Sequence, residues 1–323
     1  MGRYQCHDGH LDFVALASAT PGSSNSPPRV GPVVISEIMY HPLSTESEFI
    51  ELYNLTATNV PLYDIAYPSN TWHLTGAIDY IFPQNSFIPS HGYILLVATS
   101  PADFRSRYGV PPAVEVFGPY AGLLDNNGDS IKLRHPGDPE VDGFVPYIIT
   151  DRVKYNDVSP WPELADGAGP SLQKTTLSSY GNDAVNWQAS KCADGSPGEG
   201  HVRVPRRWLI AHGYTNNFSA AELTDSDGDG MLAWQEYEAD TIPTNCESVL
   251  QIYLDRVADR TLRNLRWNAS GNRYYTIERF TNLMENPVVD PDFDHVRGIS
   301  SPMSHSISVS NAPNFYRLKV EVY

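Results

Sequence analysis

The chain contains few cysteines, few basic residues and no long apolar run. Its three cysteines, Cys6, Cys192 and Cys246, include no C-x-x-C pair, so either one disulfide with a free thiol or three free thiols is compatible with the sequence. Only 22 Lys and Arg residues stand against 38 Asp and Glu, which argues against nucleic acid and anionic membranes as partners. Since no apolar run is long enough to cross a bilayer, we expect no membrane insertion.

Familiar catalytic motifs are also missing. The sequence contains no G-x-S-x-G elbow, no H-E-x-x-H helix, no phosphate-binding G-x-x-x-x-G-K and no dinucleotide fingerprint. Glu37 and Glu51, on strands expected to be neighbours and with His41 nearby, are the one carboxylate pair with potential for acid–base or metal chemistry. Buried glutamates more often accept hydrogen bonds from backbone amides or pair with arginine. We therefore predict that the protein is not an enzyme.

Turn-forming residues dominate the pattern that is present. With 26 Pro, 23 Gly and 19 Tyr, and few helical periodicities, the chain is predicted to be mostly β. Within EFIELYNL, Phe49 and Glu51 should share one face of a strand, and Ile50 and Leu52 the other. Short strands bracketed by Gly, Pro, Asn and Asp are expected at residues 33–40, 48–55, 60–65, 92–98, 130–135 and 151–157.

Two connections between these strands carry local signals. Ser100 as cap, Pro101 in the first turn and Gly109 as stop predict a helix over residues 100–109. The sequence DNNGDS at residues 125–130 predicts a β-hairpin turn. Together with the strands, these signals favour a β-sandwich.

The segment DSDGDGMLAWQE at residues 225–236 has the pattern of a twelve-residue calcium loop. Gly230 provides the sharp turn at position 6, and the clustered carboxylates repel one another unless a hard cation neutralises them. Without a cation, the segment would be an acidic surface turn. The predicted Ca²⁺ ligands are Asp225, Asp227, Asp229, the carbonyl of Met231, and Glu236.

A single loop between short helices suits a structural joint better than a calcium switch, which needs paired loops and long helices. We expect Ca²⁺ to order this joint and to fix the angle between two β-sandwiches. With a dissociation constant of about 10⁻⁴ M and about 1 mM Ca²⁺ outside the cell, binding would add about 1.4 kcal/mol of stability. That amount is enough to order a linker.

Strand patterns resume after residue 247 and end in FYRLKVEV at residues 315–322, so a second, smaller β-sandwich is expected there. The acidic stretch at residues 290–295, DPDFDH, is a weaker candidate for a cation site. It lacks both the glycine turn and the terminal glutamate of the first loop.

The N-terminal residues resemble a later part of the chain. Residues 12–25 and 186–200 both run from an aromatic through a short strand to a Pro–Gly turn. Residues 1–29 are therefore predicted to be the terminal strand of a preceding repeat plus a linker. The N-terminus has no signal-peptide pattern, so we expect a piece of a longer exported protein.

Five segments together resemble the bacterial form of the lamin tail domain. In order they are VVISEIMYHP, EFIELYN, IPSHGYILLVATSPADFRSRYG, LLDNNGDSIKLRHP and DRVKYND, within residues 33–198. The resemblance implies an immunoglobulin-like β-sandwich that binds or scaffolds and has no conserved chemistry. It also implies an origin in large exported or surface proteins of bacteria.

The segment from Trp208 to the sequence DTIPTN is similar to calcium-binding joints of such proteins, related to dockerin and thrombospondin type 3 loops. Those joints usually end in Gly-Thr-Asp-Pro-Thr-Asn. Here Asp240 replaces the glycine and Ile242 replaces the aspartate, which argues against a second cation.

Four parts are thus expected: residues 1–29, a lamin-tail-like sandwich at 30–200, an EF-hand-like calcium-binding linker at 201–246, and a small sandwich at 247–323. We predict a non-catalytic scaffold or adhesion module, extracellular or at the cell surface. Its partners would be a protein or polysaccharide there and neighbouring domains of the parent chain. The alternative is a carbohydrate-binding accessory region of a secreted enzyme, with Trp72, Trp161, Trp187 and Trp267 as sugar platforms.

Overall fold

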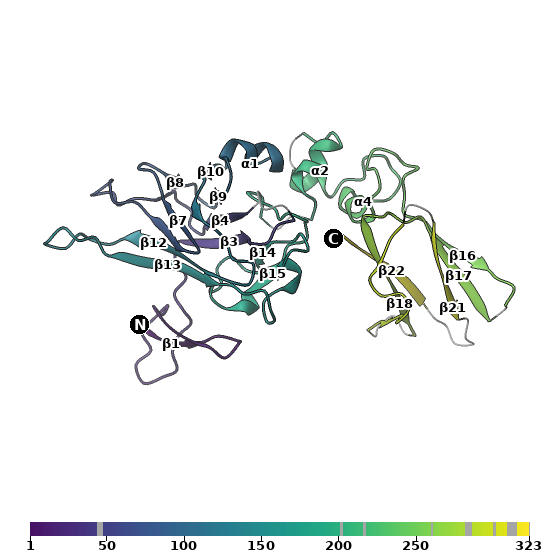
Figure 1. Cartoon of the computed structure of the whole chain (residues 1–323), viewed down its shortest axis with the longest axis horizontal. Helices are drawn as coiled ribbons and strands as arrows, with labels where there is room; N and C mark the ends of the chain where they lie inside the picture. The colour runs from purple at the N-terminus through teal and green to yellow at the C-terminus, as the bar shows by residue number, and fades with distance from the viewer. Residues whose placement is uncertain are drawn as a thin grey trace. The chain divides into compact units, whose positions relative to one another are not determined.

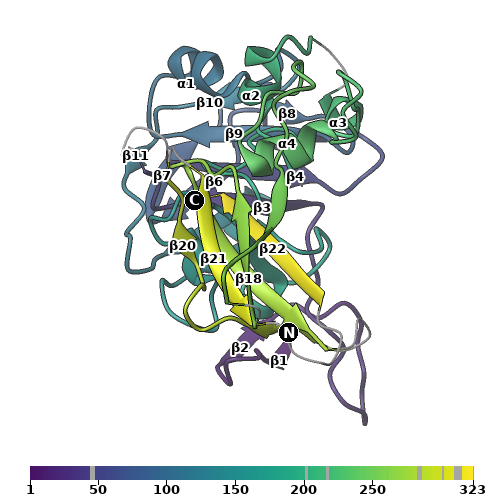
Figure 2. The ribbon, with the colours of Figure 1, turned by 90° about the vertical axis from the view of Figure 1, so that its right-hand side faces the viewer.

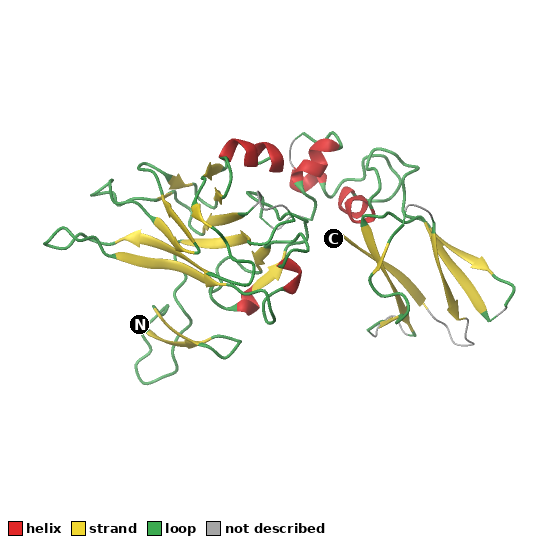
Figure 3. Cartoon of the chain, viewed as in Figure 1, coloured by secondary structure: helices red, strands yellow, loops and turns green. Residues whose placement is uncertain are grey.

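The computed structural model describes residues 1–43, 48–200, 203–215, 218–259, 261–281, 286–299, 302–308 and 315–322. Strands contain 36% of the residues and helices contain 10%, which confirms the expectation of a mostly β protein (Figure 3). The chain divides into two compact units, Met1–Pro205 and Arg206–Tyr323. Among the described residues, no helix is both long and apolar enough to cross a membrane.

Two large sheets build the first unit (Figure 1). In order across the six-stranded sheet lie β10 (Glu115–Phe117), β9 (Tyr93–Val97), β4 (Phe49–Asn54), β3 (Val33–Met39), β14 (Leu172–Lys174) and β15 (Trp187–Ala189). The five-stranded sheet contains β11 (Ala121–Gly122), β7 (Ile78–Ile81), β6 (His73–Gly76), β12 (Ser130–Pro136) and β13 (Tyr147–Lys154). Buried side chains from both sheets, among them Ile50, Leu74 and Ile131, share one core. The expected immunoglobulin-like β-sandwich is therefore present.

A second apolar cluster covers the other face of the six-stranded sheet. Phe49 and Leu95 pack there with Phe104 and Tyr108 of helix α1 (Pro101–Tyr108). Phe49 thus points toward the helix while Ile50 joins the main core, as the alternation of this strand predicted. Because both faces are covered, every residue of β3 is buried.

A β-bulge in β3 decides which face Glu37 takes. The register between β3 and β4 shifts between Ile35 and Glu37. Ile35 and Ile38 therefore both reach the main core although they are three residues apart. Glu37 lies directly opposite Glu51 in the ladder, on the side away from that core.

The two local signals had different outcomes. Helix α1 begins with Pro101 and ends before Gly109, whose φ of 65° is the left-handed conformation that glycine adopts readily, but the Ser100 side chain makes no capping hydrogen bond. At residues 125–130 the Gly128 amide donates to the Asp125 carbonyl at 3.2 Å, so a turn is present. The hairpin prediction is wrong, because the strands on either side, β11 and β12, are separated in the sheet by β7 and β6.

Smaller elements complete the first unit. Strands β1 (Gly2–Gln5) and β2 (Leu11–Val14) form their own two-stranded hairpin, and β5 (Val60–Pro61) pairs with β8 (Phe87–Ile88). Short 3₁₀ turns occupy Glu163–Ala165 and Ala184–Asn186. Residues 1–29 thus contribute a hairpin, and their origin in a preceding repeat stays a prediction.

The second unit begins with three helices, α2 (Arg206–Ala211), α3 (Phe218–Ala221) and α4 (Ala233–Ala239), gathered at one end of its strands (Figure 2). One sheet contains β16 (Ile252–Arg256), β17 (Leu262–Trp267) and β21 (Met303–Ser308). In the other sheet, β18 (Arg273–Phe280) pairs with β19 (Val288–Val289), β20 (Val296–Arg297) and β22 (Phe315–Val322). Trp267 and Ile307 from the first sheet and Tyr275 and Ile277 from the second share one small core.

Candidate metal centre

The predicted calcium loop connects α3 to α4 in the second unit. Backbone hydrogen bonds close it at its base, since Ala233 donates to the Thr224 carbonyl at 2.9 Å and Trp234 donates to the Glu222 carbonyl at 3.0 Å. Gly230 has a φ of 96°, a positive value that residues with a Cβ atom rarely adopt. The loop is therefore a closed ring of backbone with its sharp turn at the glycine, as the spacing predicted.

The three aspartates converge inside this ring. One carboxylate oxygen of each of Asp225, Asp227 and Asp229 lies within 4.8 Å of the others. Backbone amides hold the side chains in place. Asp225 accepts from Gly228 at 2.8 Å and from Gly230 at 3.0 Å, and Asp229 accepts from Met231 at 2.7 Å. Hydrogen bonds from the backbone of the loop thus hold three negatively charged side chains close to one another.

Three carboxylate oxygens in this group have no hydrogen-bond partner. They are Asp227 Oδ2, Asp229 Oδ2 and Glu236 Oε2. All three atoms are buried, and no described residue donates a hydrogen bond to them. Glu236 as a whole is buried, with 0% exposure. Leaving a buried charged oxygen unsatisfied costs more than the roughly 1–3 kcal/mol of a neutral group. A divalent cation among these oxygens would remove that cost.

The electrostatics of Glu236 point in the same direction. Burial, followed by the charges of Asp227 and Asp229, raises the pKa of the Glu236 carboxyl to about 7. Without a cation, this side chain therefore carries a proton in a large share of molecules at neutral pH. Met231 lies in the loop at the expected place, and the role of its carbonyl as a ligand stays a prediction.

Residues outside the loop hold Glu236, the last of the predicted ligands. The hydroxyl of Thr241 lies 3.5 Å from Glu236 Oε1 and also 3.5 Å from the Glu236 carbonyl. At the start of α4, the Gln235 side chain accepts from the Leu232 amide at 2.8 Å, which stabilises the first turn of the helix that carries Glu236. The sequence motif gave no indication of Thr241, because that residue lies beyond the twelve positions.

Helix α4 is fixed to the sheets of the second unit by Asp240 and Arg273. Asp240 ends the helix with a φ of 59°, and its carboxylate accepts from Ser270 and from Asn272. The Arg273 guanidinium lies 3.4 Å from Asp240 Oδ1 and donates to the carbonyls of Tyr237 and Glu238. The aspartate that replaces the usual glycine therefore joins the helix to the start of β18.

The weaker cation candidate is used in a different way. Asp290 Oδ2 lies 3.0 Å from His305 Nε2, and Asp294 accepts from the Thr276 hydroxyl at 3.2 Å. In the part of the chain that the structure describes, these aspartates do not form a group of three ligand atoms within 4.8 Å. They attach the segment between β19 and β20 to strands β21 and β18 instead.

Glu37 and Glu51 are brought together, as expected, but their oxygens are occupied. Glu37 accepts from the Ser196 amide at 2.9 Å and from the Ser171 hydroxyl. Glu51 accepts from the Gly198 amide at 2.7 Å and from the Ser36 hydroxyl at 2.6 Å. The expectation that these glutamates bind backbone amides is confirmed. His41 pairs with Asp166 at 2.6 Å instead.

Burial governs the charge of this pair. It raises the pKa of Glu37, and burial together with the Glu37 charge raises the pKa of Glu51 well above its ordinary value. A cavity of about 120 Å³ lies beside the two carboxyls, lined also by Tyr93 and Gln173. Two adjacent, fully buried carboxyls therefore favour the state in which one of them is protonated.

Two further expectations are corrected or resolved. Trp72, Trp161, Trp187 and Trp267 are all at most 7% exposed and belong to the cores, so they cannot serve as sugar platforms. The three cysteines form no disulfide with one another; Cys6 and Cys192 are buried and Cys246 is exposed.

Comparison with known proteins bears on the first unit. No curated protein matches the chain. A family model described as Lamin Tail Domain matches residues 26–148, which run from the approach to β3 as far as the start of β13. Such domains are typically non-catalytic, and the match indicates a structural module. The expected resemblance is therefore confirmed for the larger part of the sandwich, where residues 26–148 are similar to the lamin tail domain.

Proposed function

We propose that the protein is a non-enzymatic scaffold or adhesion module of the cell surface or extracellular space, in which Ca²⁺ stiffens the helical segment at the start of the second unit. The observation that carries the proposal is the set of three buried, partnerless oxygens on Asp227, Asp229 and Glu236. A protein with no use for a cation would have no reason to keep them together at this cost.

Ca²⁺ suits this group better than other common cations. All the side chains that converge are carboxylates, and hard oxygen ligands select calcium, magnesium or manganese over zinc and copper. Calcium accepts six to eight oxygen ligands in flexible geometry, whereas magnesium demands a strict octahedron, so a loop with five predicted oxygen-bearing ligands favours calcium. Calcium at about 1 mM outside cells would fill a site of about 10⁻⁴ M.

The mechanical effect follows from how α4 is attached. Glu236 lies on the helix that Asp240 and Arg273 join to β18, so a cation that bridges Asp227 to Glu236 ties the loop to the sheets. Bound Ca²⁺ would thereby make the loop at residues 225–236 and helix α4 a rigid extension of the sheets of the second unit. A rigid extension presents neighbouring domains in a fixed direction, which is what a scaffold requires.

Limited proteolysis tests the proposal. We expect chelator to accelerate cleavage within residues 222–235, and added Ca²⁺ to suppress it, while cleavage of the lamin tail domain stays the same. Asp227→Ala should be cut rapidly under both conditions, whereas Asp292→Ala, in the weaker acidic stretch, should behave like the wild type. Equal cutting of the wild type with and without chelator would refute the calcium-dependent joint.

A further inference from the structure

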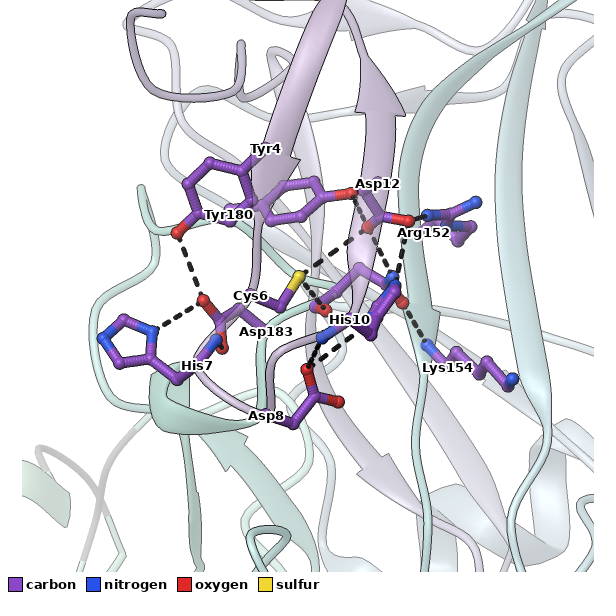
Figure 4. A network of polar contacts seen from close by, with 11 residues as sticks. Tyr4, Cys6, His7, Asp8, His10, Asp12, Arg152, Lys154, Tyr180 and Asp183 are labelled. Carbon is purple, nitrogen blue, oxygen red and sulfur yellow. Dashed lines mark hydrogen bonds and ion pairs between the residues drawn. The ribbon is translucent and has the colours of Figure 1, made fainter. Parts of the chain in front are cut away.

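A second group of ligand-forming side chains lies in the first unit, at the turn of the β1–β2 hairpin. One ligand atom each of Cys6, Asp8 and His10 lies within 4.8 Å of the other two. The three residues alternate along the turn in the sequence CHDGH, and Figure 4 shows their side chains around it. A thiol, an imidazole and a carboxylate together have the donor chemistry of a transition-metal site rather than that of a calcium site.

The backbone holds this turn in a fixed shape. The Cys6 amide donates to the His10 carbonyl at 2.9 Å, and the Gly9 amide donates to the Cys6 carbonyl at 2.9 Å. Gly9 has a φ of 87°, which a residue with a side chain rarely adopts. The His10 amide also donates to Asp8 Oδ1 at 3.0 Å. The relative positions of the three side chains are thus set before any ion binds.

A buried network orients the histidine from behind. His10 Nε2 lies 3.1 Å from Asp12 Oδ1 (Figure 4). Asp12 itself accepts from the Tyr180 hydroxyl at 2.6 Å, from the Asn182 side-chain Nδ2 at 2.7 Å and from the Arg152 guanidinium. Metal-binding histidines commonly donate their second ring nitrogen to a carboxylate in this way. When Nε2 donates to Asp12, the lone pair of Nδ1 is left for an ion.

The other side of the imidazole faces a second acceptor. His10 Nδ1 lies 3.3 Å from Asp8 Oδ1. A lone pair on Nδ1 and a carboxylate oxygen repel each other at that distance unless a proton or a metal ion lies with them. The buried sulfur of Cys6 lies in the same group of three atoms. A proton would be shared by the nitrogen and the oxygen alone, whereas a metal ion could use the sulfur as a third ligand.

We propose that Cys6, Asp8 and His10 form a binding site for a zinc-class divalent metal ion. One thiolate and one carboxylate balance the charge of the ion, and the neutral imidazole completes a three-residue set. The Cys6 thiol loses its proton when the ion binds, and the proton goes to solvent.

The site has an open side. Asp8 and His10 line a cavity of about 380 Å³ together with Lys154, Asn156 and Trp161, whereas Cys6 is not among the lining residues. A tetrahedral ion with three protein ligands would therefore direct its fourth position to this cavity, where water or a small anionic ligand can bind it. The site would be independent of the calcium loop, since the two lie in different units.

Metal binding to the whole chain tests the proposal. The protein, reduced, stripped of metal and saturated with Ca²⁺ so that the acidic loop is filled, is titrated calorimetrically with Zn²⁺ and followed by absorption with Co²⁺. We expect one Zn²⁺ per chain, and with Co²⁺ a sulfur-to-metal charge-transfer band. Asp8→Asn and Cys6→Ser should each weaken Zn²⁺ binding by about tenfold or more. Cys6→Ser should also abolish the charge-transfer band.

Cys246→Ser is the matched control, because Cys246 is an exposed cysteine in the other unit and its loss should change neither signal. Asp8 is exposed, so Asp8→Asn should leave the fold intact. This variant therefore tests the site even if Cys6→Ser unfolds the hairpin. Absence of a thiolate band with Co²⁺ in the wild type, or Zn²⁺ binding that survives Asp8→Asn unchanged, would overturn the site. Zn²⁺ binding abolished only by Asp227→Ala would overturn it as well.

Discussion

Two groups of acidic residues in this molecule solve the same electrostatic problem differently. Glu37 and Glu51 lie fully buried side by side, and hydroxyls and backbone amides of the protein donate to their oxygens. The acidic loop leaves Asp227 Oδ2, Asp229 Oδ2 and Glu236 Oε2 without donors. The comparison teaches that the supply of donors, rather than the number of carboxylates, separates a structural acidic pair from a candidate cation site.

The largest effect should come from a third arrangement, a buried pair of opposite charge. Asp151 accepts from the Ile35 amide at 2.8 Å and lies 3.4 Å from the ammonium of Lys174, which has 0% exposure. Asp151→Ala would leave both groups buried without their partner. We expect the free energy of unfolding of the first unit to fall by about 3–5 kcal/mol in urea titrations.

Asp138→Ala, at an exposed position in the β12–β13 connection, should change that free energy by no more than about 0.5 kcal/mol. A loss below about 1 kcal/mol for Asp151→Ala would mean that buried charge in this sandwich does not depend on a specific partner.

Calcium should have the next largest effect, and only on the second unit. At Ca²⁺ concentrations 10 to 100 times the dissociation constant, we expect its unfolding free energy to rise by about 1.4–2.7 kcal/mol. Glu236→Gln removes one of the partnerless charged oxygens and should abolish most of that gain. Thermal unfolding followed by calorimetry, with and without chelator, measures both values.

Asp292→Asn, in the other acidic stretch of the same unit, is the control and should keep the full response to Ca²⁺. If Ca²⁺ raises the unfolding free energy of Glu236→Gln and of the wild type equally, the partnerless oxygens do not form a Ca²⁺ site. The supply of hydrogen-bond donors would then not distinguish a cation site from the Glu37–Glu51 pair.

The pH dependence of stability should separate the two acidic groups. A carboxyl whose pKa is raised in the folded state binds more protons there than in the unfolded state, so stability falls as pH rises between the two pKa values. For Glu236 without Ca²⁺, that window runs from 4.5 to about 7. For Glu37 and Glu51 it also begins near 4.5 and extends upward to their raised values.

Hydrogen exchange at pH 5 and pH 8 reads both sites in one sample. Ca²⁺ should remove the pH dependence of the protection factors in α4, corrected for the intrinsic exchange rate, but leave that of the protection factors in β3 and β4. Glu51→Gln should reduce the dependence in β3 and β4, while Glu140→Gln, at an exposed position, should not. A calcium effect on β3 and β4 would show that the two groups are not independent.

The smallest effect concerns the attachment of α4. Asp240→Asn keeps a residue that tolerates the left-handed conformation but removes the charge that faces Arg273. We expect a loss of about 0.5–1.5 kcal/mol from the second unit in urea unfolding. Asp255→Asn removes the charge of an exposed pair with Arg266, side chains 45% and 41% exposed, and should cost at most about 0.5 kcal/mol. Equal losses would mean that Asp240 is no more than a surface charge.

A feature of this structure could be predicted from the sequence when the residues that form it lie close together along the chain. The turn at Gly230 and the convergence of the three aspartates could be predicted because the twelve positions of the loop are contiguous, and the strands around Phe49 because alternation is local. The attachment of Asp240 to Arg273 joins residues 33 positions apart and left no local pattern. The hairpin predicted at residues 125–130 failed for the same reason, since strand order in the sheet is decided by distant pairing.

The turn at Cys6, Asp8 and His10 shows where an additional signal was available. Residues two apart in a tight hairpin turn can converge, and the alternation of cysteine, aspartate and histidine is visible in the sequence. What the sequence did not show is the support from Asp12, which depends on Arg152 and Tyr180 well over a hundred residues later.

The covering of the six-stranded sheet on both faces has a consequence for how such a domain diversifies. Every position of β3 contacts a packed interior, so almost any substitution there is penalised, and mutational drift is confined elsewhere. In β12 of the opposite sheet, Ile131 and Leu133 are buried while Lys132 between them is partly exposed. The exposed side of β12 can therefore change residue by residue without disturbing either packed layer.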